Sequence, residues 1–190
     1  MALKQSHRTL RSYQKITRTA LFIALCVVLG YLFLPVPNLE MITAGIFLSG
    51  VWMGPLYGLL IGFLAEAIYS ITNPMGFPPP PLLVAQVSAM SLVGLTGGLL
   101  GRLLLRPGPF AGRSWIYCIL MGGIGAVLTI VYDLLTNLSF PLAAGFSGDQ
   151  IRIALAMGIP YAAIHIATNA AIFAIIIPVL LNRFPAWRSP

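Results

Sequence analysis

The chain is poor in charge, and above all in acidic residues. Asp and Glu together number four among 190 residues, and all charged residues make up 8% of the sequence. A soluble globular domain carries about 25% charged residues, so this composition excludes an ordinary soluble fold. The chain is instead 58% hydrophobic, with a mean hydropathy of +0.93. We therefore expect an all-α membrane protein that crosses the bilayer several times.

Cysteine is also scarce, and its spacing matches no ligand motif. Cys26 and Cys118 lie in or beside apolar segments and form no CxxC pair, so we interpret them as small buried hydrophobic residues and expect neither metal nor cofactor. The net charge of +7 would suit nucleic acid, but the basic residues fall in loops, as membrane insertion predicts. No nucleic-acid partner is therefore expected. The first apolar run lacks a small-residue cleavage site and is expected to remain as a membrane span.

Apolar runs between Pro and Gly residues predict the architecture. We expect a basic segment at 1–16, a compact bundle of six transmembrane helices within 17–182 and a tail at 183–190. The predicted spans are about 17–34, 41–53, 55–71, 82–101, 115–139 and 156–181. The second is short for a full crossing, which needs about 20 residues. Glycines four residues apart, such as Gly54, Gly58 and Gly62, predict close helix packing.

The basic residues orient this bundle. Six spans place ten of the eleven Lys and Arg residues on one side, and only Arg152 on the other. Loops rich in Lys and Arg stay in the cytoplasm. Both the N-terminus and the C-terminus are therefore predicted to be cytoplasmic.

Two of the four acidic residues, Glu66 and Asp133, fall inside apolar segments. An ionised carboxylate in hydrocarbon is costly and normally faces a bundle interior or a wet cavity. Further polar side chains are expected at the same level of the outer half of the bundle: Tyr69, Asn73, Gln86, Asn137, Tyr161, His165 and Asn169. This convergence predicts a substrate pocket that opens outward beneath loops 35–40 and 72–81.

Each of these residues also has a structural interpretation. His165 could be a core histidine bonded to a neighbouring backbone group. Asn137 and Asn169 could join helices, and Tyr69 and Tyr161 could belong to the interfacial aromatic belt. The two carboxylates are harder to explain in this way, because only His165 offers them a cation inside the membrane.

The segments PVPNLEMITAGIFLSGVWMGPLYGLLIGFLAEAIYSITNPMG, LLVAQVSAM and HIATNAAIFAIIIP, together with six spans and a short second span, resemble the substrate-binding S components of energy-coupling factor (ECF) vitamin transporters over about residues 17–181. The resemblance implies a multi-pass protein of a prokaryotic cell membrane. Such a protein binds a vitamin-like substrate and works with a transmembrane coupling subunit and two cytoplasmic ATPases. No G-x-x-x-x-G-K-[ST] motif occurs here, so ATP hydrolysis would come from those partners.

The resemblance also assigns roles to individual residues. Ala20 and Ala24 match the Ala-xxx-Ala spacing through which the family docks its coupling subunit. By position, the ligand contacts would come from Asn38, Glu40, Gln86, Asp133, Asn137, His165 and Asn169.

Two other functions compete with this interpretation. A small proton-coupled carrier could use Glu66, Asp133 and His165 as a relay, although no internal inverted repeat is evident. An intramembrane serine protease could use Ser147, in the sequence Gly145-Phe-Ser147-Gly148, with His165. Ser147 falls in a predicted loop, so we interpret it as part of a turn and expect no catalytic residue.

The predicted pocket offers carboxylates, amides and aromatic rings but no Lys or Arg, which favours a neutral or cationic heterocycle over an anion.

Overall fold

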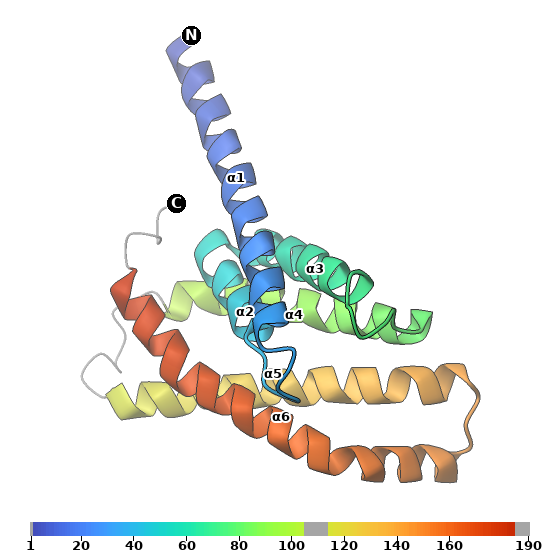
Figure 1. Ribbon diagram of the computed structural model, residues 1–190. Helices are drawn as coiled ribbons and strands as arrows, with labels where there is room; N and C mark the ends of the chain where they lie inside the picture. Colours follow the sequence, from blue (N-terminus) through green and yellow to red (C-terminus); the bar gives the residue numbers. More distant parts are fainter. Residues whose placement is uncertain (1, 105–113, 185–190) are drawn as a thin grey trace.

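The computed structural model describes residues 2–104 and 114–184, and this part of the chain contains six helices and no strand. Figure 1 shows α1 (Ala2–Leu32), α2 (Ile42–Met53), α3 (Pro55–Ile71), α4 (Pro80–Leu104), α5 (Ser114–Ala143) and α6 (Gly148–Arg183). Four of them, α1, α4, α5 and α6, contain apolar stretches long enough to cross a membrane, whereas α2 and α3 are shorter. The all-helical membrane class is confirmed. The number of crossings stays a prediction.

Four helices extend beyond the predicted spans, α4 by two residues at its start and three at its end. Helix α1 begins at Ala2 rather than near residue 17, α5 continues to Ala143, and α6 begins at Gly148 rather than near 156. A capping box at Ser147 explains the early start of α6. The Ser147 hydroxyl accepts from the Gln150 amide at 3.4 Å, and the Gln150 side chain accepts from the Ser147 amide at 2.8 Å. The basic residues were expected in loops, and this was wrong for most of them: the five before residue 19 lie on α1, Arg102 lies on α4, and Arg152 and Arg183 lie on α6.

The helices form two layers with α1 across them. Helices α5 and α6 pack as an antiparallel pair joined by a short loop, and α2, α3 and α4 pack together on one side of that pair (Figure 1). Helix α1 packs on α2 and α3 and runs across the direction of α4, α5 and α6, with its N-terminal part projecting away (Figure 1). The expected compact bundle therefore describes α2–α6 better than it describes α1.

Backbone-to-backbone contact joins α2, α3 and α4. A Cβ atom added to Gly58 would collide with the Gly94 carbonyl, one added to Gly94 would collide with the Gly58 carbonyl, and Gly50 is blocked by Gly94 in the same way. Small residues permit this approach in lipid, where dispersion contacts drive helix association. Gly58 and Gly62 thus pack as expected, but Gly54 does not. It adopts φ 93° between α2 and α3 and faces open space.

The two layers meet through aromatic packing. Phe47 of α2 and Phe173 of α6 are both fully buried, with ring centroids 5.2 Å apart. Gly125 of α5 leaves room for Phe173, because a Cβ there would lie 2.6 Å from the ring. The α5–α6 pair is thereby held close to α2, and the polar residues described below lie between the layers.

Replacing Gly94 by Ala tests the backbone contact between α3 and α4. Alanine favours helix over glycine by about 1 kcal/mol, so stabilisation would be expected if space allowed. We expect Gly94→Ala instead to lower stability by about 1–3 kcal/mol, because the Cβ meets backbone that cannot move aside. Thermal unfolding in detergent measures the change.

Gly123→Ala is the matched control, because a Cβ at Gly123 of α5 meets nothing within 4 Å. This variant should unfold at the wild-type temperature or slightly above it. Equal behaviour of the two variants would contradict the proposed tight contact.

Candidate functional site

An imidazole held between two carboxylates lies at the centre of the site. His165 of α6 places Nδ1 2.8 Å from Oδ1 of Asp133 on α5, and Nε2 3.5 Å from Oε1 of Glu40. The three side chains are only 12–17% exposed. Carboxylate oxygens accept but do not donate, so both ring nitrogens are placed to carry protons. This geometry suits a cationic imidazolium that balances buried negative charge.

Glu40 is the most heavily bonded of these groups. It lies in the loop between α1 and α2, where it accepts from the Thr43 amide at 3.1 Å, from the Thr43 hydroxyl, and from Nδ2 of Asn169 at 3.0 Å. Burial by itself would raise the pKa of the Glu40 carboxyl, but the hydrogen bonds from His165, Thr43 and Asn169 lower that pKa below its ordinary value. Glu40 is therefore positioned as an ionised acceptor.

The loop that carries Glu40 is attached to α6 at two points. In addition to the contacts of Glu40, the Thr168 hydroxyl lies 2.7 Å from the Asn38 carbonyl oxygen. Asn38 thus contributes its backbone, and it adopts a positive φ of 58°, a conformation that asparagine tolerates better than most residues. This part of the expected lid, loop 35–40, lies against the site.

A second polar group comes from α3 and α4. The Ser70 hydroxyl lies 3.0 Å from Oε1 of Glu66 and 3.3 Å from Oε1 of Gln86. Glu66 is 1% exposed, and it lies near enough to Glu40 for the two carboxylates to repel each other. The glycine contact between α3 and α4 fixes the separation of these side chains.

Tyr132 links the two groups. Its ring meets that of His165 edge-on, with centroids 5.9 Å apart, and its phenol lies close to Gln86, Glu40 and Glu66. Together these residues form the polar cluster, which comprises Glu40, Glu66, Gln86, Tyr132, Asp133, His165 and Asn169. Sequence reasoning missed Tyr132, because one residue along a helix turns by about 100° and the argument followed the face of Asp133. It also missed Thr43 and Ser70, although Ser70 follows Glu66 at helical spacing.

Five expected site residues lie outside the polar cluster, and one of them is Asn38, which meets α6 through its backbone carbonyl. Tyr69 packs against Tyr31 with ring centroids 5.1 Å apart, although its phenol remains close enough to Glu66 and Glu40 to interact electrostatically. Asn73 accepts from the Met75 amide at 2.9 Å in the loop after α3. Asn137 is exposed and faces Gly158 on α6. The Tyr161 side chain is 66% exposed.

Three buried oxygens of the polar cluster have no hydrogen-bond donor among the described residues. They are Oε2 of Glu66, Oδ2 of Asp133 and Oδ1 of Asn169. An unpaired buried acceptor costs about 1–3 kcal/mol, so three together are unusual in one site. They come from three different helices, α3, α5 and α6.

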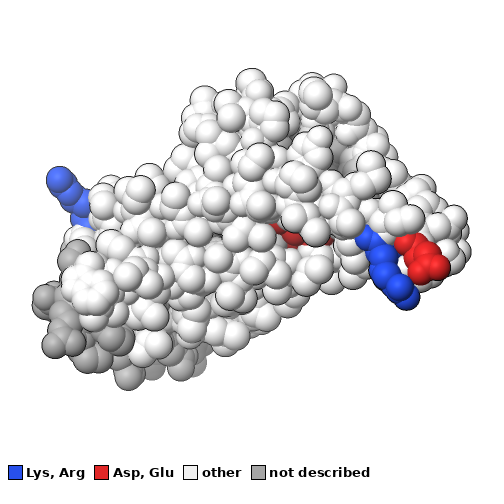
Figure 2. All heavy atoms as spheres, turned by 90° about the horizontal axis from the view of Figure 1, so that it is seen from below, with Lys and Arg blue, Asp and Glu red and all other residues white. Residues whose placement is uncertain are grey.

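The face that shows acidic atoms is mostly uncharged. Figure 2 shows acidic atoms in a narrow recess among uncharged side chains; basic atoms project at one end of this face, and acidic and basic atoms lie together near the other end. Near that end, on α6, Asp149 and Arg152 pair at 3.4 Å with side chains 85% and 82% exposed. Glu40 and Asp133 keep 17% and 14% side-chain exposure, whereas Glu66 is 1% exposed.

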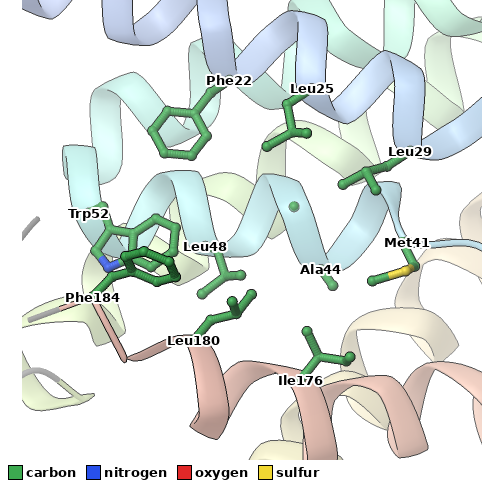
Figure 3. Close-up of a pocket in the computed structure, with 11 residues that line it drawn as sticks. Phe22, Leu25, Leu29, Met41, Ala44, Leu48, Trp52, Ile176, Leu180 and Phe184 are labelled. Atoms are coloured by element: carbon green, nitrogen blue, oxygen red, sulfur yellow. The ribbon is translucent and has the colours of Figure 1, made fainter. Parts of the chain in front are cut away.

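A cavity outside the polar cluster is apolar. It has a volume of about 220 Å³ between α1, α2 and α6 (Figure 3). Its lining is formed by Phe22, Leu25, Leu29, Met41, Ala44, Gly45, Leu48, Trp52, Ile176, Leu180 and Phe184. Binding sites combine apolar walls with a few polar groups that fix orientation. This cavity lacks such convergent groups, so the polar cluster is the better candidate for ligand recognition.

The candidate docking residues and the candidate serine nucleophile lie away from the polar cluster. Ala20 and Ala24 are exposed on α1, on the helix that lines the apolar cavity. Ser147 caps α6, and 18 residues of that helix, about 27 Å, separate it from His165. A Ser–His catalytic pair requires hydrogen-bond contact, so the protease interpretation fails on geometry. Within the described ranges, no group of three His, Cys, Asp or Glu side chains is arranged to hold a metal ion.

The pairing of Asp133 with His165 can be tested by a double-mutant cycle. Asp133→Asn and His165→Gln should each lower the unfolding temperature without added ligand, and the double variant should lose less than the sum. Contacting pairs of this kind couple by about 0.5–3 kcal/mol. Asp149→Asn is the control and should change stability by no more than about 0.5 kcal/mol, because Asp149 is exposed. Additive losses at Asp133 and His165 would show that the contact contributes nothing.

Comparison with known proteins gives one result. No curated protein and no solved structure matches the chain. The family model described as "ECF transporter, substrate-specific component" matches residues 14–181. The match covers all the described residues of α2–α6 except the last two of α6, Asn182 and Arg183, and it includes every residue of the polar cluster. The chain therefore belongs to the ECF transporter substrate-specific component family, a family of transporter subunits and not of enzymes.

Proposed function

We propose that the chain captures a vitamin-like micronutrient in the polar cluster and delivers it as the S component of an ECF-type importer. One observation carries this proposal: buried polar side chains from α3, α4, α5 and α6 and from the loop before α2 converge in a protein otherwise built for lipid. Polar groups inside a membrane domain are costly and typically mark substrate pathways. Family membership favours substrate binding over a structural role.

The proposed topology has six crossings of a prokaryotic plasma membrane and cytoplasmic termini. The distribution of Lys and Arg supports it, because ten of the eleven basic residues then share one side. The short helices α2 and α3 follow each other through Gly54 and pack on α4. Neighbouring protein can satisfy the ends of such short segments within a bilayer.

Single-cysteine labelling tests this topology. In a Cys26→Ser, Cys118→Ser background, a cysteine at position 108 should react with an impermeant maleimide only after the membrane is opened. A cysteine at 144, between α5 and α6, should react in intact cells. The reverse pattern would invert the orientation, and reaction of both from outside would contradict six crossings.

The proposed partners are a transmembrane coupling subunit and two cytoplasmic ATPases. Ala20 and Ala24 are exposed on α1 with helical spacing, which suits close contact with another helix. The apolar cavity lies on a different face of α1, because its lining residues Phe22 and Leu25 are turned by about 100° or more from Ala20 and Ala24. No residue of the polar cluster lies on α1. Ligand binding and subunit docking would therefore use different surfaces of the protein.

Docking and binding should be separable by substitution. Ala24→Trp or Ala20→Trp adds bulk to the α1 face, so we expect transport and co-purification of the coupling subunit to be lost while ligand affinity is unchanged. Asp133→Ala should weaken binding by roughly 5- to 150-fold, the equivalent of about 1–3 kcal/mol for one lost buried partner, while the coupling subunit still co-purifies. Uptake assays, pull-down and calorimetry measure the three properties.

Ala163→Trp controls for the effect of bulk, because Ala163 is exposed on α6. It should leave uptake, docking and affinity unchanged. If α1 bulk abolished ligand binding while Asp133→Ala did not, the assignment of the two surfaces would be wrong. Uptake that needed a proton gradient and no ATPase would instead favour the proton-coupled carrier.

A further inference from the structure

We propose that the ligand of the polar cluster is a neutral or cationic nitrogen compound that carries several N–H donors and no carboxylate. The inference rests on the proposed function, because it concerns the ligand of that same site. It is carried by the three unpaired oxygens on α3, α5 and α6, which are acceptors without a donor in the described part of the chain.

The orientation of the Asn169 amide is set by its neighbour. Its Nδ2 lies 3.0 Å from Oε1 of Glu40, and a carboxylate oxygen can only accept. The amide therefore turns its nitrogen to Glu40 and its oxygen away. Because Asn169 is 1% exposed, this oxygen is shielded from bulk solvent and adds an acceptor to the site.

Glu66 and Asp133 each use one carboxylate oxygen and leave the other unpaired. Oε1 of Glu66 faces Ser70, and Oδ1 of Asp133 faces His165. The second oxygen of each is buried without a donor. Glu66 is 1% exposed, so leaving its carboxylate with a single hydrogen bond is costly. A ligand that donates to both carboxylates would remove this cost.

The balance of charge around the polar cluster also favours a neutral or cationic ligand over an anion. Glu40, Glu66 and Asp133 are three of the four acidic residues, and His165 is the one basic group that contacts them in the described ranges. Arg152 precedes His165 by 13 residues of α6, about 20 Å, and pairs with Asp149. A bound anion would therefore meet carboxylates without a free cation, whereas a cation would be attracted.

Two tyrosines complete this preference. Tyr132 and Tyr69 both lie close to the carboxylates of Glu40 and Glu66. Aromatic faces attract cationic and flat nitrogen-containing groups.

The experiment compares two kinds of probe by calorimetry on the purified chain. Thiamine and cobalamin carry N–H donors and no free carboxylate, whereas biotin and pantothenate are carboxylates. We expect at least one of the first two to bind and neither of the last two. Binding of biotin or pantothenate alone would overturn the ligand class but leave the proposed function intact.

Binding of none of the four would also overturn the ligand class. Co-purification of the coupling subunit would then show whether the transporter assignment survives, so the two failures are distinguishable.

Charge-removing variants test the atoms themselves. Glu66→Gln and Asp133→Asn preserve side-chain size but convert one acceptor into a donor, so each should weaken the bound probe by about tenfold or more. Asp149→Asn is the control, because Asp149 lies in an exposed pair at the start of α6, and it should not change affinity. Unfolding temperatures without probe identify any variant that fails to fold.

If both variants fold and bind as wild type, bound water satisfies these oxygens and the inference is wrong. Full-strength binding by one variant alone would remove that residue's oxygen from the proposed contact set and would likewise contradict recognition by all three.

Discussion

The cost of placing charge in an apolar interior governs this protein. His165 can occupy the middle of the domain because carboxylates from two other segments flank it at 2.8 Å and 3.5 Å. A buried ion pair is stable only with good geometry and additional hydrogen bonds, and Thr43 and Asn169 supply such bonds to Glu40. The pairing also joins α5, α6 and the α1–α2 loop. The electrostatic contact that defines the candidate site therefore also attaches that loop to α6, in addition to the hydrogen bond from Thr168 to the Asn38 carbonyl.

The glycine contact between α3 and α4 stabilises the other side of the site through close backbone packing. Hydrocarbon surrounds the protein, so helices gain little from burying apolar surface and associate through close packing. Gly58 and Gly94 allow backbone contact, which places Glu66 of α3 and Gln86 of α4 on either side of Ser70. Rigid packing on this side and paired charge on the other fix the spacing of the polar cluster.

The apolar cavity and the polar cluster differ in the groups that they offer to a ligand. The apolar cavity between α1, α2 and α6 offers volume but no groups that could fix the orientation of a polar ligand. The polar cluster offers unpaired acceptors on three helices. Under the proposed function, the polar cluster recognises the ligand and the exposed face of α1 contacts the membrane partner, so either surface can be altered without the other.

The sequence was sufficient for the class and the main elements. Long apolar runs require helices in lipid, since an isolated span must satisfy its own backbone hydrogen bonds, and Pro and Gly mark the boundaries of α2 and α3. The early start of α6 escaped prediction because the Ser147 capping box organises a polar turn that hydropathy assigns to a loop. The path of α1 across the other helices is likewise not encoded in its own periodicity, because helix direction depends on packing partners.

For the candidate site, too, the sequence identified some residues and the tertiary structure supplied their partners. The sequence by itself determined that Glu66, Asp133 and His165 are special, because ionisable side chains in apolar segments require a partner or a function. Only the tertiary structure decided the partners: His165 lies between Asp133 and Glu40, Glu66 lies beside Ser70, and Tyr132 joins the two groups. The physical reason is that depth in the membrane follows from residue number along a helix, whereas contact between helices depends on their rotation and separation.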